Sequence, residues 1–463
     1  MDPIALIITA MRRTIPALSL AVLVLAFGLW PASPAAQQAQ TSLAIRGVTL
    51  IDGTGRAPVT DVTVVVEGAR ITQVTTQPVT LPPGTQVIDG RGQFLMPGLI
   101  DVHTHLRGGG NRASEAPITP EQERNGVRAL HTFLYAGVTT IFDAGNQGSF
   151  IFALREKAKA GGIVSPRILA TGGTVTSPGG HGGPFYVESW PQDRAVLDKH
   201  LTGKPDMVKI GQDEHGWGTR PLITQLPEDL LEQIIRYYHS KGVRSTIHIS
   251  NEHNAIEAIY AGVDTLAHPV IQSPISTGFI NLMRAKRVPM ASTLTIGESY
   301  SRIAEHPEFL DQPLYRDTME AAEIERLKTV ESPRQRTDPW AQWMKIMTPI
   351  CQNNIKRLND AGKDIIALGT DRSAGADVHR ELELIVGGGV SPADAIVIAT
   401  RNSARFLGLL DEIGTIEPGK IADLVLLKAD PTKEINNAKQ IATVVRNGAV
   451  VDRGKLDLPV NRR

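Results

Sequence analysis

Two histidines one residue apart stand at the end of an apolar segment, residues 97–105, which reads PGLIDVHTH. Side chains alternate between the two faces of a β-strand, so His103 and His105 are expected to point the same way. Both imidazoles can then reach one metal ion. The pair by itself predicts half of a metal site.

Further residues of metal-binding type occur farther along the chain, and each closes a segment with strand character. A single histidine in such a context is more often a satisfied core residue than a ligand. A set of such residues, each at a strand end, is a more specific signal and indicates one shared site. These residues are Lys209, His248, His268 and Asp371.

Lys209 ends the apolar segment 206–210 (DMVKI). An ammonium group there, facing a site for two cations, would be costly. Carbamylation by carbon dioxide would convert the amine into an anionic carbamate that can bridge two metals. The alternative is a buried lysine held in an ion pair.

The elements that would position these residues alternate between strand and helix. Eight candidate strands span 99–105, 139–144, 167–174, 207–211, 245–250, 265–269, 289–296 and 365–371. Helical patterns span 121–136, 150–160, 227–241, 254–261 and 348–361. This order predicts an α/β fold, a TIM (β/α)8 barrel over residues 97–410, whose catalytic groups lie at the C-terminal ends of its strands. All six metal-type residues fall at such ends.

Both ends of the chain have β character, and we expect residues 42–96 and 411–458 to form one small composite β-sandwich domain. The segment 297–347 does not fit a bare barrel. It is long and charged, contains Trp340 and Trp343, and follows the seventh strand on the active-site side. It is either a lid or specificity element, or an oligomer contact or loose insert.

The first residues resemble an export signal. Arg12 and Arg13 precede an apolar run over 15–30 and small residues over 32–36. This order predicts a signal peptide over 1–38 and a periplasmic or secreted enzyme without a membrane anchor after cleavage. A retained anchor is the alternative, and the true start is either Met1 or Met11.

Composition limits the possible partners. Lys+Arg and Asp+Glu are both 48, so the net charge is zero and no nucleic-acid partner is indicated. The single cysteine, Cys351, excludes an internal disulfide and a cysteine-rich metal site. We expect a homo-oligomer that acts on a small molecule.

With these motifs in place, the chain resembles the amidohydrolase superfamily. The resemblance rests on 97–101 (PGLID), the strand-end residues and 413–424 (IGTIEPGKIADL), and it covers nearly all of the mature chain. It implies that His103, His105 and Asp371 hold the more buried of two metals. It also implies that His248 and His268 hold the second, with carbamylated Lys209 and a hydroxide bridging them.

Within the superfamily the chain looks most like the imidazolonepropionase-related branch, which includes Xaa-Pro and Xaa-Arg dipeptidases and ochratoxin-type carboxypeptidases. Those enzymes carry a Gly-His-Gly loop, which here is 179–184 (GGHGGP). By this resemblance His181 polarises the scissile carbonyl or holds the substrate, although a loop histidine can also cap backbone groups. His379 is a further candidate for substrate contact.

The resulting hypothesis is a binuclear metal-dependent amidohydrolase. A metal-bridged hydroxide would cleave an amide or peptide bond in a dipeptide or N-acyl amino acid, and Asp371 would carry the proton to the leaving amine. Zinc suits the nitrogen and oxygen ligands, while manganese, cobalt and iron remain open. A substrate carboxylate would need a cation, for which Arg220 and Arg372 are favoured over Arg107.

Other activities remain open on the same scaffold: a cyclic-amide hydrolase, a lactonase or a deaminase. Lys209 argues against the mononuclear deaminases, which lack a bridging lysine. A relative without catalytic activity that serves in binding or assembly is a further alternative.

Overall fold

The computed structural model describes residues 42–214 and 222–460. The predicted signal peptide over 1–38 and the candidate Arg220 lie outside the described residues. Among the described residues, no helix has both the length and the apolar character needed to cross a membrane.

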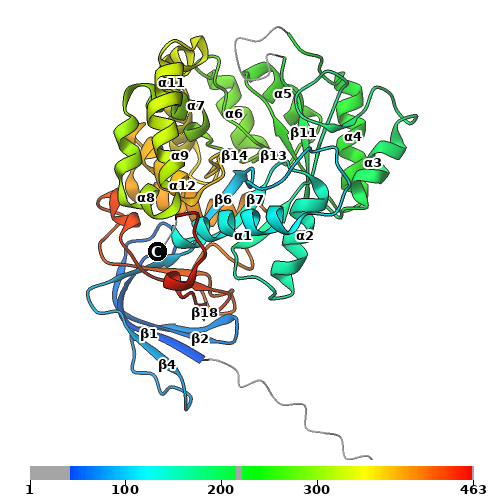
Figure 1. Ribbon diagram of the computed structural model, residues 1–463. Helices are drawn as coiled ribbons and strands as arrows, with labels where there is room; N and C mark the ends of the chain where they lie inside the picture. The colour runs from blue at the N-terminus through cyan, green and yellow to red at the C-terminus, as the bar shows by residue number, and fades with distance from the viewer. Residues whose placement is uncertain (1–41, 215–221, 461–463) are drawn as a thin grey trace, which may run out of the picture. The chain divides into compact units, whose positions relative to one another are not determined.

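The centre of the fold is a set of parallel strands that alternate with helices (Figure 1). Three strands form one sheet, in the order β6 (Leu99–Thr104), β7 (Val138–Asp143) and β8 (Arg167–Ala170). Seven form another, in the order β10 (Pro184–Tyr186), β9 (Thr174–Thr176), β11 (Met207–Gly211), β12 (Arg244–His248), β13 (Thr265–Leu266), β14 (Met290–Ala291) and β15 (Ile366–Ala367).

Backbone hydrogen bonds join these two sheets at both ends. The amide of Val102 in β6 donates to the carbonyl of Leu368, just after β15, at 2.9 Å. At the other end, the amide of Asp206 donates to the carbonyl of Ala170 in β8 at 2.9 Å. The strands are therefore continuous at both seams.

Helices follow most of the strands and cover them with one apolar face. In α4 (Glu228–Ser240) the buried side chains Leu230, Leu231, Ile234 and Tyr238 recur at helical spacing. In α1 (Pro120–Tyr135), Thr119 and Gln122 form a capping box at the start of the helix. The other helices are α2 (Gly148–Lys159), α3 (Arg194–Leu201), α5 (Glu252–Tyr260), α6 (Thr277–Lys286), α12 (Gly375–Gly387), α13 (Pro392–Val397), η3 (Ile398–Asn402) and α14 (Ser403–Phe406).

One predicted strand is wrong in part. The prediction over 289–296 becomes the short β14, and α7 (Leu294–Glu305) begins inside the predicted range. Thr293 takes a left-handed conformation, φ 31°, and turns the chain. The buried carboxylate of Glu381 then accepts the amides of Leu294 and Thr295 at 2.9 and 2.7 Å, which stabilises a helix start there.

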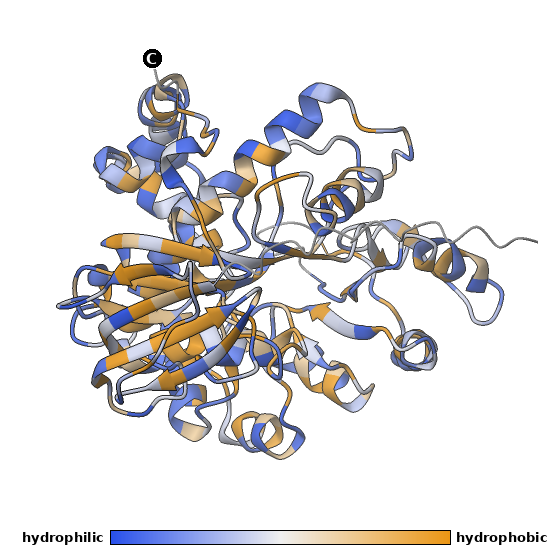
Figure 2. Ribbon diagram, turned by 90° about the horizontal axis from the view of Figure 1, so that it is seen from below, coloured by the Kyte–Doolittle hydropathy of each residue, from blue (hydrophilic) through white to orange (hydrophobic). Residues whose placement is uncertain are grey.

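The two chain ends meet in one eight-stranded sheet. Its order is β18 (Ala449–Val450), β17 (Ile441–Arg446), β16 (Leu424–Leu427), β5 (Phe94–Pro97), β1 (Ser42–Leu50), β2 (Val59–Glu67) and β3 (Arg70–Thr75), with β4 (Gln86–Asp89) paired to β1. Short 3-10 turns, η4 (Ile435–Lys439) and η5 (Arg453–Lys455), flank the late strands. Figure 2 shows how apolar residues concentrate along the strands. The ends combine as expected, and their folding into a sandwich stays a prediction.

The segment 297–347 is helical. After α7 come η1 (Pro307–Asp311), α8 (Pro313–Thr318), α9 (Ala321–Arg326), η2 (Leu327–Glu331), α10 (Ser332–Arg336) and the long α11 (Pro339–Ala361). Helix α7 packs along α11, as Figure 1 shows. Ile303, Leu310 and Tyr315 form a buried apolar cluster together with Ala376 of α12. The segment therefore has a small core and is not a loose insert.

Candidate active site

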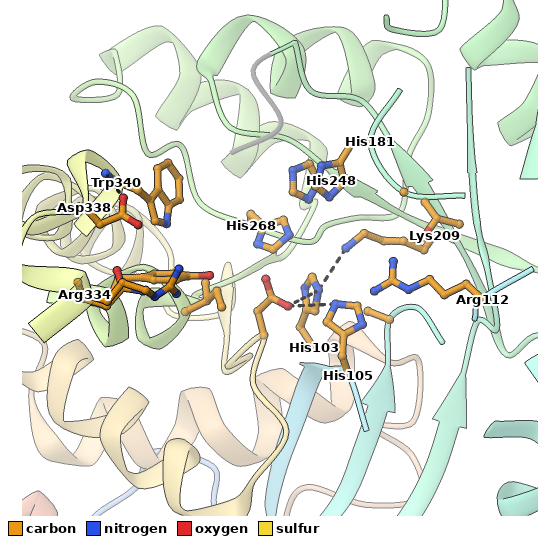
Figure 3. A pocket seen from close by; sticks show the side chains of 17 residues that line it. His103, His105, Arg112, His181, Lys209, His248, His268, Arg334, Asp338 and Trp340 are labelled. Carbon is orange, nitrogen blue, oxygen red and sulfur yellow. Dashed lines mark hydrogen bonds and ion pairs between the residues drawn. The ribbon is translucent and has the colours of Figure 1, made fainter. Parts of the chain in front are cut away.

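A pocket of about 480 Å³ opens where the parallel strands end, and Figure 3 shows side chains converging in it. The structure brings together in this pocket every strand-end residue that the sequence suggested, together with the loop histidine. These residues are His103, His105, His181, Lys209, His248, His268 and Asp371.

The first group of ligand atoms comes from β6 and from the turn after β15. Nδ1 of His103 lies 2.9 Å from the carbonyl of Ala267, and Nδ1 of His105 lies 2.7 Å from the carbonyl of Gly145. Each carbonyl fixes a proton on Nδ1 and leaves Nε2 free to bind a metal. Oδ1 of Asp371 is 3.7 Å from Nε2 of His103 and 3.0 Å from Nε2 of His105.

Asp371 is held in place by its backbone. Its φ of 53° is left-handed, which is unusual for aspartate, and its amide donates to the carbonyl of His103 at 2.7 Å. Gly369 permits this close approach, because a Cβ there would lie 2.9 Å from Cβ of His103. The preceding Thr370 donates from Oγ1 to buried Asp101 at 2.6 Å.

A second group of ligand atoms lies across the pocket and consists of His181, Asp213 and His248, whose atoms fall within 4.8 Å of one another. The rings of His181 and His248 stack at 3.8 Å. Nε2 of His248 is 3.2 Å from Oδ2 of Asp213, and Ser250 donates to Oδ1 of Asp213 at 2.6 Å. The sequence reasoning missed Asp213. Its position four residues after Lys209, just past the same strand, was the available signal.

His268 lies between the two groups. Its ring centroid is 4.4 Å from that of His248 and 4.5 Å from that of His103, and Nδ1 is 3.0 Å from Oγ1 of Thr293. The resemblance had paired His248 with His268. The structure keeps those rings adjacent and adds Asp213 and His181, so the ligand set of the second metal stays a prediction.

Lys209 extends between the two groups (Figure 3). Nζ is 3.3 Å from Nε2 of His103, and within residues 42–214 and 222–460 no carboxylate lies within 4.0 Å of it. Burial lowers the pKa of Lys209 to about 7, although Asp371 opposes this. A neutral amine is the form that reacts with carbon dioxide, and the carbamate stays a prediction.

The electrostatics of the donors suit a divalent cation. Burial lowers the pKa of His103, His248 and His268, and the neighbouring His248, followed by burial, lowers the pKa of His181 to about 2. Burial alone would raise the pKa of Asp371, but His103 and His105 lower it below its usual range. The site therefore offers neutral imidazoles and an anionic carboxylate, which fits metal binding.

Among the described residues, those predicted to contact the substrate, apart from His181, are not found in the lining of this pocket. His379 does not line the pocket. It lies buried in α12, where Nε2 is 2.9 Å from the carbonyl of Ala136, so it serves as a packed helix residue. Arg372 and Arg107 line a neighbouring cavity, and Arg220 lies outside the described residues.

Two other arginines line this pocket, which we call the metal pocket after its candidate metal ligands. They are Arg112 from the loop after β6 and Arg334 from α10. Sequence reasoning missed both, because a loop arginine and a helix arginine carry no spacing signal. Arg334 is already paired with Glu331 at 2.5 Å. For Arg112, the described residues include no carboxylate within 4.0 Å, and Figure 3 shows its guanidinium directed toward the pocket.

The remaining wall of the pocket comes from 297–347. We call its lining residues the insert wall: Tyr300, Arg334, Gln335, Asp338 and Trp340. The ring of Trp340 stacks on Trp343 at 5.1 Å and meets Tyr300 edge-on at 6.0 Å. The insert thus contributes directly to the pocket, as a specificity element would.

The chain is similar to known proteins over most of its length. The sequence profile of the amidohydrolase family matches residues 94–451. Imidazolonepropionase from Rubrobacter xylanophilus is 24% identical over 396 residues, which cover 80% of this chain and 85% of that protein. A structure assigned as a prolidase from Bifidobacterium longum is 26% identical, with a TM-score of 0.71 over 91% of this chain and 96% of that one. Ochratoxinase from A. niger shares the fold, with 18% identity and a TM-score of 0.69 over 89% of this chain and 95% of that one.

Proposed function

The chain belongs to the amidohydrolase family and is a metal-dependent hydrolase of carbon–nitrogen bonds, and we propose that it is a binuclear enzyme that cleaves a small amide substrate. The substrate would be a dipeptide or an N-acyl amino acid. The observation that carries this proposal is the pair of ligand groups on either side of Lys209, His103–His105–Asp371 and His181–Asp213–His248.

The scaffold we propose is a closed (β/α)8 barrel. Parallel strands with continuous hydrogen bonding at both seams support closure, as does the position of the pocket at the strand ends. In such a barrel the strand ends hold ligands rigidly while the loops vary.

The donor set fits two divalent ions, for which zinc is the first choice. The first group would hold one ion. His248, with His268 or with His181 and Asp213, would hold the second, and Lys209 as its carbamate would bridge them. When bound, such ions polarise a carbonyl and lower the pKa of water.

The chain's own residues would handle the proton and the substrate. Asp371 remains anionic at neutral pH, so its carboxylate can accept the proton of the attacking water and pass it to the leaving amine. His181 is neutral and lines the pocket, where it would hold the scissile carbonyl group. Asp213 accepts from Ser250 and fixes the ring of His248.

Arg112 suggests that the substrate bears a free carboxylate. Its guanidinium faces the pocket without an ion-pair partner among the described residues, and guanidinium–carboxylate pairing is geometrically specific. Trp340 and Tyr300 of the insert wall offer an aromatic surface for the substrate side chain. The likeness to a prolidase supports a dipeptide of this kind.

A cyclic-amide hydrolase is the second candidate. The likeness to imidazolonepropionase favours it, since an imidazolone ring contains a cyclic amide. We also propose export by residues 1–38, on the N-terminal pattern alone, which N-terminal sequencing of the exported protein would test.

The deciding experiment is a hydrolysis screen of purified, metal-loaded enzyme against dipeptides, N-acyl amino acids and cyclic amides. We expect turnover of open-chain substrates with a free carboxylate and little turnover of their carboxamide analogues. Turnover confined to cyclic amides would replace the proposal with the second candidate. No hydrolysis of any class by protein with bound metal would contradict both.

A further inference from the structure

A second cavity, of about 650 Å³, adjoins the metal pocket. Tyr300 and Gln335 line both, so they form the wall between them. Its other walls come mainly from helices of the insert, from α1, from the loop after β6 and from the start of α12, and no strand-end histidine among the described residues lines it. We call this cavity the insert chamber. The proposed reaction does not use it.

Most charges in the insert chamber are already neutralised locally. Each of three glutamates has its own arginine, and Arg128 has an aspartate. The pairs are Glu298 with Arg380 at 2.8 Å, Glu323 with Arg326 at 2.8 Å, Glu331 with Arg334 at 2.5 Å and Arg128 with Asp457 at 3.0 Å. Glu320 is exposed to solvent. These groups leave little net charge.

Arg302 is different. Its side chain is only 9% exposed, and its guanidinium lies 3.8 Å from the ring centroid of Phe309. Nη1 is 3.3 Å from the hydroxyl of Tyr315. Among residues 42–214 and 222–460, no carboxylate lies within 4.0 Å of it. Tyr315 in turn donates to Asp377 at 3.5 Å, so this guanidinium is linked to a carboxylate only through a hydroxyl and can still pair directly with an anion.

Arg372 adds a second cation, although 32% of its side chain is exposed. Its Nε is buried and has no hydrogen-bond partner among the described residues. The only carboxylate near it in that part of the chain is Asp377, at 3.8 Å from Nε. Burial raises the pKa of Asp377, while Arg372, Arg107 and Arg302 all act to lower it. Several guanidiniums therefore surround one carboxyl group.

Part of the remaining wall of the insert chamber is apolar, beside polar residues such as Thr295 and Ser299. Leu310 belongs to the buried cluster of the insert and α12, and Phe309 and Leu327 pack against that cluster. A ligand that pairs with these guanidiniums and also contacts the apolar residues would combine one negative charge with an apolar or aromatic body. We propose that the insert chamber binds an organic acid, with its carboxylate held between Arg302 and Arg372 and its apolar body against Phe309, Leu310 and Leu327.

Calorimetry on the full, metal-loaded chain tests this without any assay of hydrolysis. The probe is 3-phenylpropionate, and its uncharged match is 3-phenylpropanamide. We expect the acid to bind about tenfold more tightly than the amide, and Arg302→Met to weaken the acid by about tenfold, because a buried charge pair is lost. Arg128→Met is the matched control. It removes a guanidinium from the same chamber that is already paired, and it should change affinity less than about twofold.

A second variant tests the proposal independently if Arg302→Met does not fold. Leu327→Trp keeps both arginines and fills the chamber, so it should also weaken the acid by about tenfold with an unchanged melting temperature. Equal binding of acid and amide would overturn the proposal. So would a loss of binding in Arg112→Met but not in Arg302→Met, because that result would place the acid in the metal pocket.

The acid bound in the chamber is either one end of the substrate or a separate effector. Steady-state kinetics with a known substrate distinguish the two. If the acid raises the KM of the substrate competitively, the chamber receives one end of the substrate through the Tyr300–Gln335 wall. If the acid changes kcat with little effect on KM, the chamber binds a separate effector. The binding result stands on its own, even if the proposed hydrolysis fails.

Discussion

The strand-end floor of the metal pocket and the insert wall beside it are built in opposite ways. The floor residues His103, Lys209 and His268 are at most 3% exposed and lie in parallel strands or just past a strand end. The wall residues come from helices of an added segment, and Arg334 there is fixed by its own ion pair with Glu331. The two regions therefore have different roles. The floor supplies metal ligands and a proton acceptor for catalysis, and the wall supplies the surfaces that determine which substrate fits.

The largest loss of activity is expected from a substitution in the floor of the pocket. Asp371→Asn removes both a metal ligand and the proton acceptor, so we expect kcat to fall by about 10³-fold. Asp338→Asn, the matched change in the insert wall, should cost less than about tenfold. Steady-state kinetics on both variants measures the contrast. Similar losses in the two would erase the distinction between floor and wall.

Lys209→Ala should be nearly as damaging, with kcat reduced by about 10²- to 10³-fold, because the bridging anion is lost. Acetate or another short carboxylic acid should restore part of the activity by taking its place. Asp371→Asn provides the control, since the same acid should not rescue it. A crystal structure with an unmodified Lys209 beside two bound metals would rule out the carbamate.

Arg112→Met tests whether Arg112, from the loop after β6, binds a carboxylate of the substrate. We expect kcat/KM to fall by about 10- to 100-fold for substrates with a free carboxylate and hardly at all for their carboxamides, since only the former lose a charge pair. Arg334→Met should have a smaller effect, because Glu331 already occupies that guanidinium. An equal loss for acids and amides would show that Arg112 does not read the carboxylate.

The smallest effect on activity should come from a histidine outside the pocket. Burial lowers the pKa of His379 to about 4, so between pH 4 and 6.5 the unfolded chain binds a proton there that the folded chain does not. Its contribution to the free energy of unfolding, about 3 kcal/mol, is complete above pH 6.5 and is lost as the pH falls toward 4.

Denaturation at several pH values measures this, with His379→Gln as the test. The variant should lose stability less steeply with acid than the parent chain and should keep its kcat. A variant with unchanged acid sensitivity would show that His379 is not buried in its neutral form. A large loss of kcat would return His379 to the list of substrate contacts.

The sequence predicted the floor because its signals are local. Apolar strands that end in His248 or Asp371 can be recognised along the chain, and the predicted strand over 207–211 matches β11 in full. Lys209 stood out because a charged residue in an apolar strand is costly. The β character of both chain ends predicted that they form one β domain, and strands from both ends do pair in the eight-stranded sheet, while the sandwich stays a prediction.

What could not be predicted depends on contacts between distant segments. Arg112 and Trp340 line the same pocket only after folding, and neither follows a spacing rule. The early start of α7 depends on Glu381, a carboxylate 86 residues from Thr295 in the chain. The insert chamber likewise forms mainly from α1, the helices of the insert, the loop after β6 and the start of α12, which lie far apart in the sequence.

The central claim is that Lys209 lies between two metals. Anomalous diffraction from crystals of the zinc-loaded protein tests it most directly. Two peaks are predicted, one at His103, His105 and Asp371 and one beside His248, with continuous density from Nζ of Lys209 between them. A single peak at the first group, with Lys209 unmodified, would contradict the account.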